Sequence, residues 1–357
     1  MNRVYNYSPG PSMLPLPVLE RAQKELVTFS DTGMSVLEMS HRSKMYLSIY
    51  DRAVQGIRDL MHIPDTYAVL FLQGGATEQF SAVPLNLNRA GKADYIDSGN
   101  FAHLAAEEAK RYLTVCTVAS SRADNYTYVP DWKGKLNPDA GYVHITTNNT
   151  IYGTRYTALP ETGGVPLVAD MSSNILSEVY DITKFGVVYA GAQKNIGPAG
   201  LALVIVRKDL FGQANPLCPK LMNWEKQAEN DSMINTPNTY GIYMAGLCFE
   251  WLKDLDGVEA MEKINIEKAR LFYAYLDESK LFKSPAQKEY RSRMNITFVT
   301  GDEALDDQFV KEAAKAGLVN LKGHRSVGGM RASLYNAMPA EGVKALVDFM
   351  KAFEAKH

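Results

Sequence analysis

Short apolar runs recur along the first part of the chain, and most of them stop at a polar or glycine-rich turn. Runs rich in Val, Leu and Ile that are bounded by turn residues predict buried strands. The predicted strands are residues 67–72, 93–97, 142–146, 165–169, 187–190 and 201–206. Helical stretches, such as the amphipathic segment 44–62, alternate with these strands. The alternation predicts an α/β fold in which helices cover both faces of a mostly parallel sheet.

The pattern changes beyond about residue 260. A strand at 294–300, a helix at 306–316 and a strand at 331–335 predict a smaller α+β unit. A last helix begins near Pro339. Its apolar residues recur at helical spacing, so they are expected to face a core.

The N-terminus differs from both parts. Residues 5–17 contain four prolines and one glycine, which favour an extended segment, and a helix is predicted over residues 18–29. We expect a large domain over residues 16–258. A small α+β domain is expected to combine residues 1–15 with residues 259–357.

Composition narrows the classes of function. The 357 residues are 46% hydrophobic and 22% charged, with a formal net charge of −2, so no basic surface suggests nucleic acid or an acidic membrane. No apolar run approaches the roughly 20 residues that span a bilayer, and no signal peptide is evident. The three cysteines are far apart and suggest neither disulfides nor a metal site. We therefore expect a cytosolic protein with neither nucleic-acid nor membrane partners.

The chemistry centres on Asp170, which ends one predicted strand, and Lys194, which follows the next. This layout is typical of a pyridoxal phosphate (PLP) site, where a Lys binds the cofactor aldehyde and a carboxylate pairs with the pyridinium nitrogen. The Lys must be neutral to react, so it needs burial or nearby positive charge to lower its pKa.

Taken alone, the two residues are better explained as a helix-capping Asp and a surface Lys. The string AGAQKNIGPAGLAL (190–203) changes this balance, because small residues precede Lys194 and glycines follow it. Small residues let the backbone approach a flat cofactor. The string resembles the lysine signature of the class-V aminotransferases, a branch of the fold-type I PLP enzymes.

Two other regions predict anion binding. Gly74 and Gly75 lie in a strand-to-helix turn whose free N–H groups can hold a phosphate, although such turns are common and this one lacks the GK[ST] of a Walker motif. Near the C-terminus, His324 and Arg325 precede Arg331, which lies in a predicted strand. A strand Arg needs a partner, either a neighbouring acid or the carboxylate of a bound amino acid.

A second cationic pair, His41 and Arg42, lies near the N-terminus and would by itself be an ordinary solvated turn. Together with His324, Arg325 and Arg331, it would suit a substrate that carries both a carboxylate and a phosphate.

The whole chain resembles the phosphoserine aminotransferases, a family within class V. The resemblance rests on NYSPGPSMLP (6–15), SHRS (40–43), QGGATEQF (73–80), NNTIYGT (148–154), ADMSSNILS (169–177), YAGAQKNIGPAGL (189–201), NTPNTY (235–240), RSRMN (291–295) and GHRSVGGMRASLYNAM (323–338). The lysine motif identifies only the class, whereas the GHRSVGGMRAS segment is far more specific.

The resemblance implies a fold-type I PLP-dependent transferase, with a mostly parallel seven-stranded sheet flanked by helices and a smaller α+β C-terminal domain. It implies reversible transamination between O-phospho-L-serine plus 2-oxoglutarate and 3-phosphonooxypyruvate plus L-glutamate, a step of serine biosynthesis. Bacterial members often also use 4-phosphonooxy-L-threonine, on the route to pyridoxine.

The resemblance also implies a role for each motif residue. Lys194 would form the Schiff base and act as acid and base, and Asp170 would pair with the pyridinium nitrogen. The remaining cofactor contacts would be Ala76, Thr77, Phe101, Thr150, Gln193, Asn235 and Thr236. Arg331 would bind the substrate α-carboxylate. The substrate phosphate would be surrounded by His41, Arg42, His324 and Arg325.

A homodimer is implied as well, because Asn235, Thr236, His41 and Arg42 act across the subunit interface in this family. The chain departs from the family pattern at two positions. Phe101 stands where many members stack a Trp on the cofactor, so the π-face is smaller. Thr77 stands where some members have an Arg that can contact phosphate. Phosphate binding would therefore depend more on His41 and Arg42.

Three other classes of protein share part of this pattern. A cysteine desulfurase would need a Cys on a mobile loop, and none of the cysteines has a Gly/Ser-rich setting. A serine–glyoxylate type aminotransferase binds no phosphate and needs neither His-Arg pair. A PLP-sensing regulator would need an added DNA-binding domain, for which the chain has neither length nor a basic module.

Overall fold

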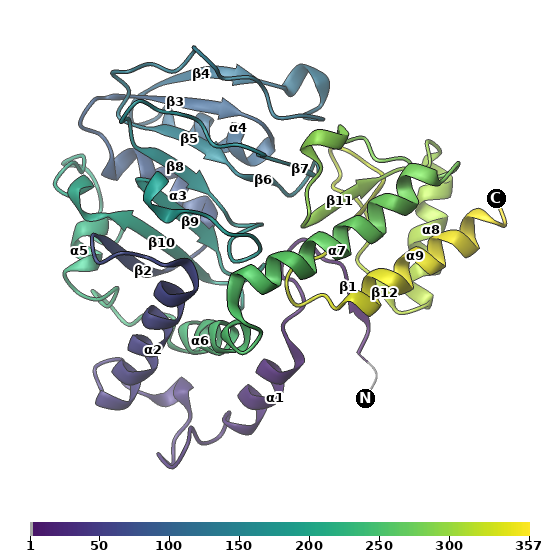
Figure 1. The fold of residues 1–357 in the computed structure, drawn as a ribbon. Coiled ribbons are helices and arrows are strands. Elements are labelled where there is room, and N and C mark those ends of the chain that lie inside the picture. The colour runs from purple at the N-terminus through teal and green to yellow at the C-terminus, as the bar shows by residue number, and fades with distance from the viewer. Residues whose placement is uncertain (1–2) are drawn as a thin grey trace.

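The computed structural model describes residues 3–357 and consists of a large sheet-based unit with a smaller unit beside it (Figure 1). The large unit holds a seven-stranded sheet of order β2-β10-β9-β8-β5-β3-β4. Its strands are β2 (Tyr67–Gln73), β3 (Lys92–Asp97), β4 (Thr114–Ser120), β5 (Val143–Thr146), β8 (Leu167–Asp170), β9 (Val187–Gly191) and β10 (Leu201–Arg207). β10 runs antiparallel to both of its neighbours, β2 and β9, and the other four strand pairs of the sheet are parallel. The predicted α/β class and mostly parallel sheet are confirmed.

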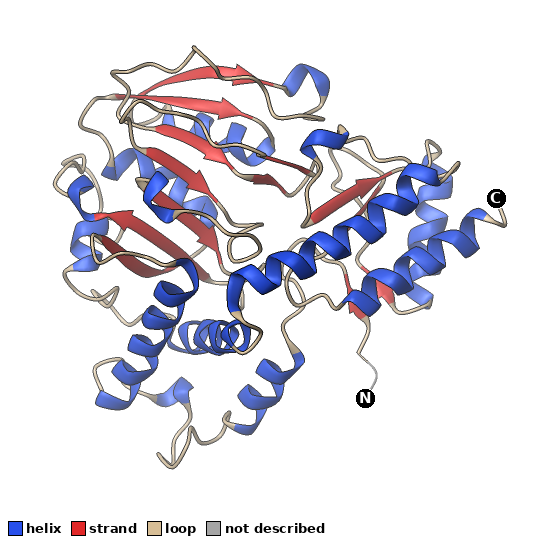
Figure 2. Ribbon diagram, viewed as in Figure 1, coloured by secondary structure: helices blue, strands red, loops and turns tan. Residues whose placement is uncertain are grey.

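Helices cover both faces of this sheet (Figure 2). One face packs on α2 (Lys44–Met61) and α6 (Thr239–Lys253), and the other on α3 (Ala76–Asn86), α4 (Asn100–Ala109) and α5 (Trp224–Ala228). Successive residues of a strand point to opposite faces, so Leu203 joins the first core and Val204 the second. Burial on both faces explains why the central strands β8, β9 and β10 are mostly apolar.

The smaller unit combines the two ends of the chain. Its helices and strands are β1 (Tyr5–Asn6), α7 (Gly257–Glu278), β11 (Asn295–Phe298), α8 (Glu303–Lys315), β12 (Leu318–Val319), β13 (Met330–Ser333) and α9 (Ala340–Glu354). β1 pairs with β12, and β11 pairs with β13. The predicted domain limits stay a prediction, and residues 1 and 2 lie outside the described part of the chain.

Two short strands, β6 (Asn148–Asn149) and β7 (Thr154–Arg155), form a hairpin after β5, and α1 (Leu16–Lys24) precedes α2. The predicted helix over residues 18–29 is wrong at its C-terminal end. The chain leaves the helix after Lys24, and the Phe29 ring packs edge-on against Tyr243 of α6, with their centroids 5.9 Å apart. A distant tertiary contact therefore replaces the last helical turn.

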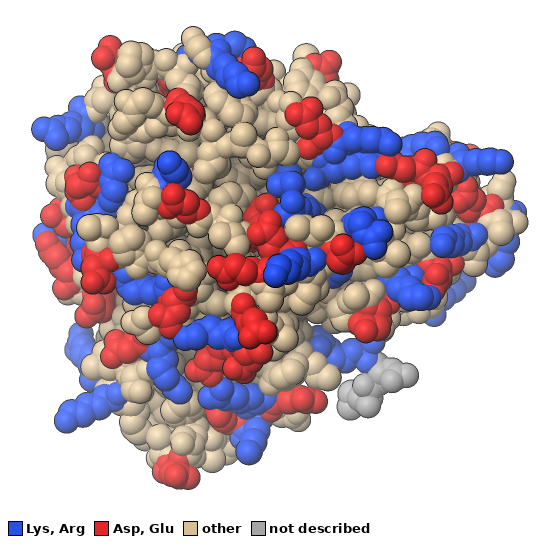
Figure 3. Space-filling model, viewed as in Figure 1, with Lys and Arg blue, Asp and Glu red and all other residues tan. Residues whose placement is uncertain are grey.

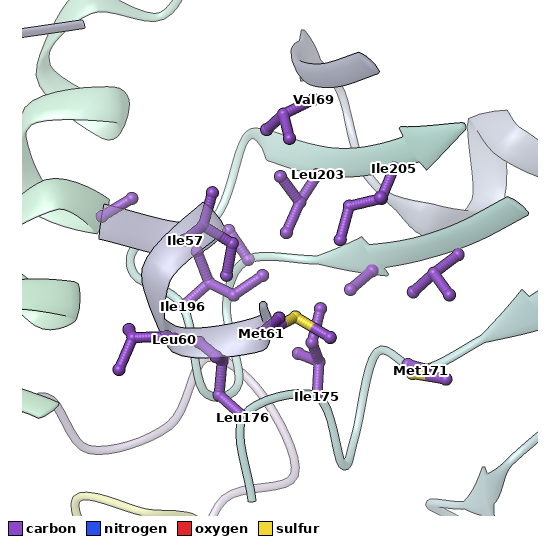
Figure 4. Close-up of a cluster of buried hydrophobic side chains, with 14 of the residues drawn as sticks. Ile57, Leu60, Met61, Val69, Met171, Ile175, Leu176, Ile196, Leu203 and Ile205 are labelled. Carbon is purple, nitrogen blue, oxygen red and sulfur yellow. The ribbon is translucent and has the colours of Figure 1, made fainter. Parts of the chain in front are cut away.

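An apolar cluster lies between α2 and the turns that follow β8 and β9 (Figure 4). Ile57 and Met61 of α2 pack toward Leu203 of β10, and Ile175 and Ile196 join the same core. Ile175 and Ile196 are fully buried, and each lies a few residues beyond Asp170 or Lys194. The core thus anchors the two turns that carry the predicted chemistry.

Acidic and basic side chains are interspersed over the face shown in Figure 3, in keeping with the small net charge. Within residues 3–357, no helix has the length and apolarity that crossing a membrane requires.

Candidate active site

A cavity of about 230 Å³ opens at the carboxyl ends of β5 and β8, where open α/β sheets place ligands. Nine of the predicted site residues line it: Ala76, Thr77, Phe101, Thr150, Asp170, Gln193, Lys194, His324 and Arg331. These residues come from both units of the molecule, so the smaller unit closes one side of the cavity.

Lys194 and Arg331 meet at Thr150. Nζ of Lys194 donates to Oγ1 of Thr150 at 2.9 Å, and Nη1 of Arg331 donates to the Thr150 carbonyl oxygen at 3.1 Å. Arg331 is only 6% exposed, and its Nε has no partner among the described residues. A buried guanidinium with so few hydrogen bonds can offer its remaining N–H groups to a ligand carboxylate.

The surroundings of Lys194 favour a reactive amine. Burial lowers the pKa of Lys194 to about 8, and the Arg331 guanidinium acts in the same direction, whereas the Asp170 carboxylate opposes it. The Phe101 ring, on the first turn of α4, lies beside the amine, with Nζ 5.6 Å from the ring centroid. A ring in this place can form one wall for a flat ligand.

Ser172 holds the Asp170 carboxylate in place. Its backbone N–H and its hydroxyl both donate to Oδ1 of Asp170, at 2.9 and 2.6 Å, and the hydroxyl accepts from the Gly191 N–H at 3.1 Å. Burial raises the pKa of the Asp170 carboxyl, while these bonds and the Lys194 charge lower it. Because both bonds use Oδ1, the second oxygen is available to a cationic ligand group.

The N-terminus of α3 provides an anion site. Gly75 caps the helix, and Ala76 and Thr77 form its first turn at the cavity wall. The unpaired N–H groups of this turn and the helix dipole both favour a phosphate. Gly74 has φ of +91°, a conformation that L side chains rarely adopt, so the turn needs glycine.

The proline-rich N-terminal segment holds the lysine from the other side. The Ser12 hydroxyl donates to the Lys194 carbonyl oxygen at 2.6 Å, and the Ser12 N–H donates to the Gln193 carbonyl oxygen at 3.0 Å. Pro9 and Gly10 line the cavity. Sequence reasoning predicted an extended segment here but missed these contacts, because nothing local links residues that are 182 positions apart.

The cavity also contains residues that sequence reasoning did not single out, among them Thr146, Asn148, Ser172 and Ser173. Thr146 pairs with Asp170 in the sheet, and its buried hydroxyl has no partner in the described part of the chain. The position of Thr146 at the end of a predicted strand was the available signal.

The other predicted residues lie outside this cavity. Arg325 is exposed on the loop that carries His324. Asn235 and Thr236 lie beside Gln73, whose side-chain amide donates to the Thr236 carbonyl oxygen at 2.6 Å. His41 and Arg42 precede α2, and neither contributes to the wall of the cavity in their own chain.

The fold and this site define a class of protein. The model of the family "Aminotransferase class-V" matches residues 4–346, and the chain belongs to this family. The relatives to which the chain is similar belong to a narrower group within this family. The phosphoserine aminotransferase of Bacillus thuringiensis subsp. konkukian is 55% identical over 359 residues, which cover 100% of each chain.

Solved structures agree with this relationship. The phosphoserine aminotransferase of Bacillus circulans subsp. alkalophilus superimposes with a TM-score of 0.97 at 44% identity, covering 99% of each chain. The PLP-bound phosphoserine aminotransferase of Trichomonas vaginalis gives a TM-score of 0.94 at 40% identity, covering 98% of this chain and 100% of that one.

Proposed function

We propose that the protein is a phosphoserine aminotransferase. It exchanges the amino group reversibly between O-phospho-L-serine and 2-oxoglutarate, giving 3-phosphonooxypyruvate and L-glutamate, with PLP as cofactor. The observation that carries the proposal is the pair formed by Lys194 and Arg331 on either side of Thr150. Lys194 has an amine of lowered pKa, and it lies beside a buried guanidinium that has no carboxylate partner among the described residues. This pair suits an α-amino acid, whose carboxylate the guanidinium binds.

The cavity residues fit PLP by their chemistry. Gly75, Ala76 and Thr77 would hold its phosphate, Phe101 would cover its ring, and Asp170 would pair with its ring nitrogen. Thr150 and Gln193 would complete the contacts. When bound, PLP supplies the electron sink that makes the α-proton of an amino acid acidic.

Each protein group then has a defined task. Arg331 binds the α-carboxylate and orients the α-carbon toward Lys194. Nζ of Lys194 takes the α-proton and later returns it, which its pKa near neutrality allows. His324 and Arg331 both line the cavity. Burial lowers the pKa of His324, and the charges of Arg331 and Arg325 lower it further, so this end of the cavity has a positive field for the substrate phosphate.

We propose a homodimer in which His41, Arg42, Asn235 and Thr236 complete the site of the second copy. Their position away from the cavity of their own chain supports this arrangement. We include 4-phosphonooxy-L-threonine as a further substrate, because it presents the same carboxylate and phosphate. The cytosolic location stays a prediction.

Absorbance of the purified protein between roughly 300 and 500 nm, where bound PLP absorbs, tests the proposal. We expect a visible band that shifts on addition of O-phospho-L-serine and responds much less to L-serine. An equal response to both amino acids would contradict a substrate that is recognised by its phosphate, and it would favour an enzyme of the serine–glyoxylate type. No band after addition of PLP would remove the whole proposal.

A further inference from the structure

Lys268 is a buried titratable group that the proposed reaction does not use. It lies on α7 and is 1% exposed. Its Nζ donates three hydrogen bonds, to the carbonyl oxygens of Leu334 at 3.1 Å, Tyr335 at 2.9 Å and Met338 at 3.0 Å. An ammonium group has three donors, so the three carbonyls use all of them, whereas a neutral amine has only two and would lose one of these bonds.

Burial lowers the pKa of Lys268 to about 7, while its three carbonyl acceptors favour the charged form. A buried cation without a carboxylate is costly, and an apolar side chain would avoid that cost. Lys268 would be explained if the turn that its ammonium group binds has a role in the function of the protein.

That turn, residues 334–338, directly follows β13, the strand of Arg331. Two of its residues reach the active site. The Asn336 N–H donates to Oδ1 of Asn195 at 3.0 Å, and Asn195 is the neighbour of Lys194 in the chain. The Tyr335 hydroxyl donates to the carbonyl oxygen of Pro9, in the cavity wall, at 2.7 Å.

A second side chain of α7 holds the same turn. Asn265, one helical turn before Lys268, donates to Oδ1 of Asn336 at 2.9 Å and to the Ser177 carbonyl oxygen at 3.0 Å. Asn336 in turn donates to the Leu176 carbonyl oxygen at 2.8 Å. The turn therefore connects α7, which extends from the smaller unit toward the sheet in Figure 1, with the segments on both sides of the cavity.

We propose that Lys268 is a positioning residue of the active site, whose ammonium fixes the 334–338 turn and, through Asn336 and Asn195, the backbone at Lys194. The inference rests on the proposed function only for the role of Lys194. The competing explanation is that Lys268 stabilises the smaller unit and has no effect at Lys194.

Hydrogen–deuterium exchange of the cofactor-free protein distinguishes a positioning role of Lys268 from a purely stabilising one. Lys268→Met keeps the length of the side chain and removes all three donors. We expect exchange to accelerate in residues 334–338 and also in residues 190–200, by roughly 5- to 30-fold. The matched control is Phe309→Leu, a fully buried residue of α8 whose aromatic contacts lie elsewhere in the smaller unit. Unchanged exchange at 190–200 in Lys268→Met, or an equal rise in the control, would overturn the proposal.

A second readout uses the PLP-loaded protein. We expect Lys268→Met, but not Phe309→Leu, to shift the pH midpoint of the visible absorbance band, because the pKa of Lys194 depends on its position relative to the charges around it. If the Met variant does not fold, Lys268→Gln can replace it, because Gln keeps two donors. We expect the same effects in this variant at smaller size. Their absence in Lys268→Gln would equally overturn the proposal. A wild-type protein without a band would contradict the proposed function, while the exchange result would still decide the role of Lys268.

Discussion

At the scale of single residues, Ser172 determines how well Asp170 can pair with a cationic ring. Ser172→Ala removes the 2.6 Å bond to Oδ1 and leaves only the backbone donor. Because hydrogen bonds to charged groups contribute about 1.5–3 kcal/mol, we expect PLP affinity to fall roughly tenfold or more. Absorbance titration with PLP measures this loss. The control is Ser177→Ala, a buried hydroxyl of the same segment that bonds the Asn174 carbonyl instead, and an equal loss in both variants would contradict the role of Ser172.

The lowered pKa of Lys194 gives a pH prediction. The neutral amine is the reactive form, so the rate at which cofactor-free protein takes up PLP should rise as the pH passes through about 8 and level off above it. Arg331 helps to lower this pKa, so Arg331→Met should move the midpoint to higher pH. Stopped-flow absorbance measures both profiles. A midpoint that stays in place in the variant would show that the charge of Arg331 does not act on Lys194.

The residues that could be predicted from sequence are those whose chemistry is visible locally. Asp170 ends an apolar strand, Lys194 follows another, and Arg331 is a cation inside a third. Ser12 could not be predicted, because it acts through backbone carbonyls of a segment far away in the chain. Lys268 was hidden for a similar reason, since its helix position gives no sign that three carbonyls surround it.

At the scale of elements, the turn that carries Lys194 depends on the apolar cluster beneath it (Figure 4). Ile196→Ala removes a fully buried side chain from that cluster, and we expect it to cost about 2–5 kcal/mol of the free energy of unfolding. Urea denaturation measures the loss. Ile264→Ala is the control, because this Ile is 41% exposed on α7 and should cost far less. Similar costs for both variants would mean that the turn does not depend on this cluster.

The strands of the central sheet were predictable for the same physical reason that makes them stable. Both faces are buried, so β2, β8, β9 and β10 are mostly continuous apolar runs, whereas β3 and β5 each include a buried polar residue, Asp94 or His144. The seventh, β4, lies at the edge with several exposed residues, and its sequence TVCTVAS gives no such run. The strand order, which brings residues 170 and 194 to the same edge, is a property of the assembled sheet and could not be deduced from local pattern.

At the scale of the whole molecule, the cavity of one chain holds only part of the predicted site. Exposed apolar side chains at Leu26, Val27 and Leu37 lie in the segment just before His41 and Arg42. Exposed apolar side chains gathered in one segment are a common feature of protein interfaces. It supports the proposed dimer, in which this segment would bring the cationic pair to the second copy.

Hybrid dimers test that arrangement directly. Lys194→Ala and Arg42→Ala variants should each be nearly inactive as homodimers. If Arg42 serves the partner's site, a hybrid dimer has one site in which both residues are intact. Random mixing makes half of the dimers hybrids, each with one working site of two, so refolding an equal mixture together should restore about a quarter of wild-type activity.

The same mixture gives a different result if Arg42 serves its own chain. Each site of a hybrid would then lack either Lys194 or Arg42, so no activity would return. Mixing the two folded homodimers without unfolding is the control, because it measures the residual activity of the two variants. An Arg42→Lys variant tests whether charge alone suffices, since Lys lacks the planar fork that binds phosphate through two N–H groups. Recovery near a quarter would establish that the site is shared between subunits, because no rearrangement within a single chain can place an intact Arg42 beside an intact Lys194.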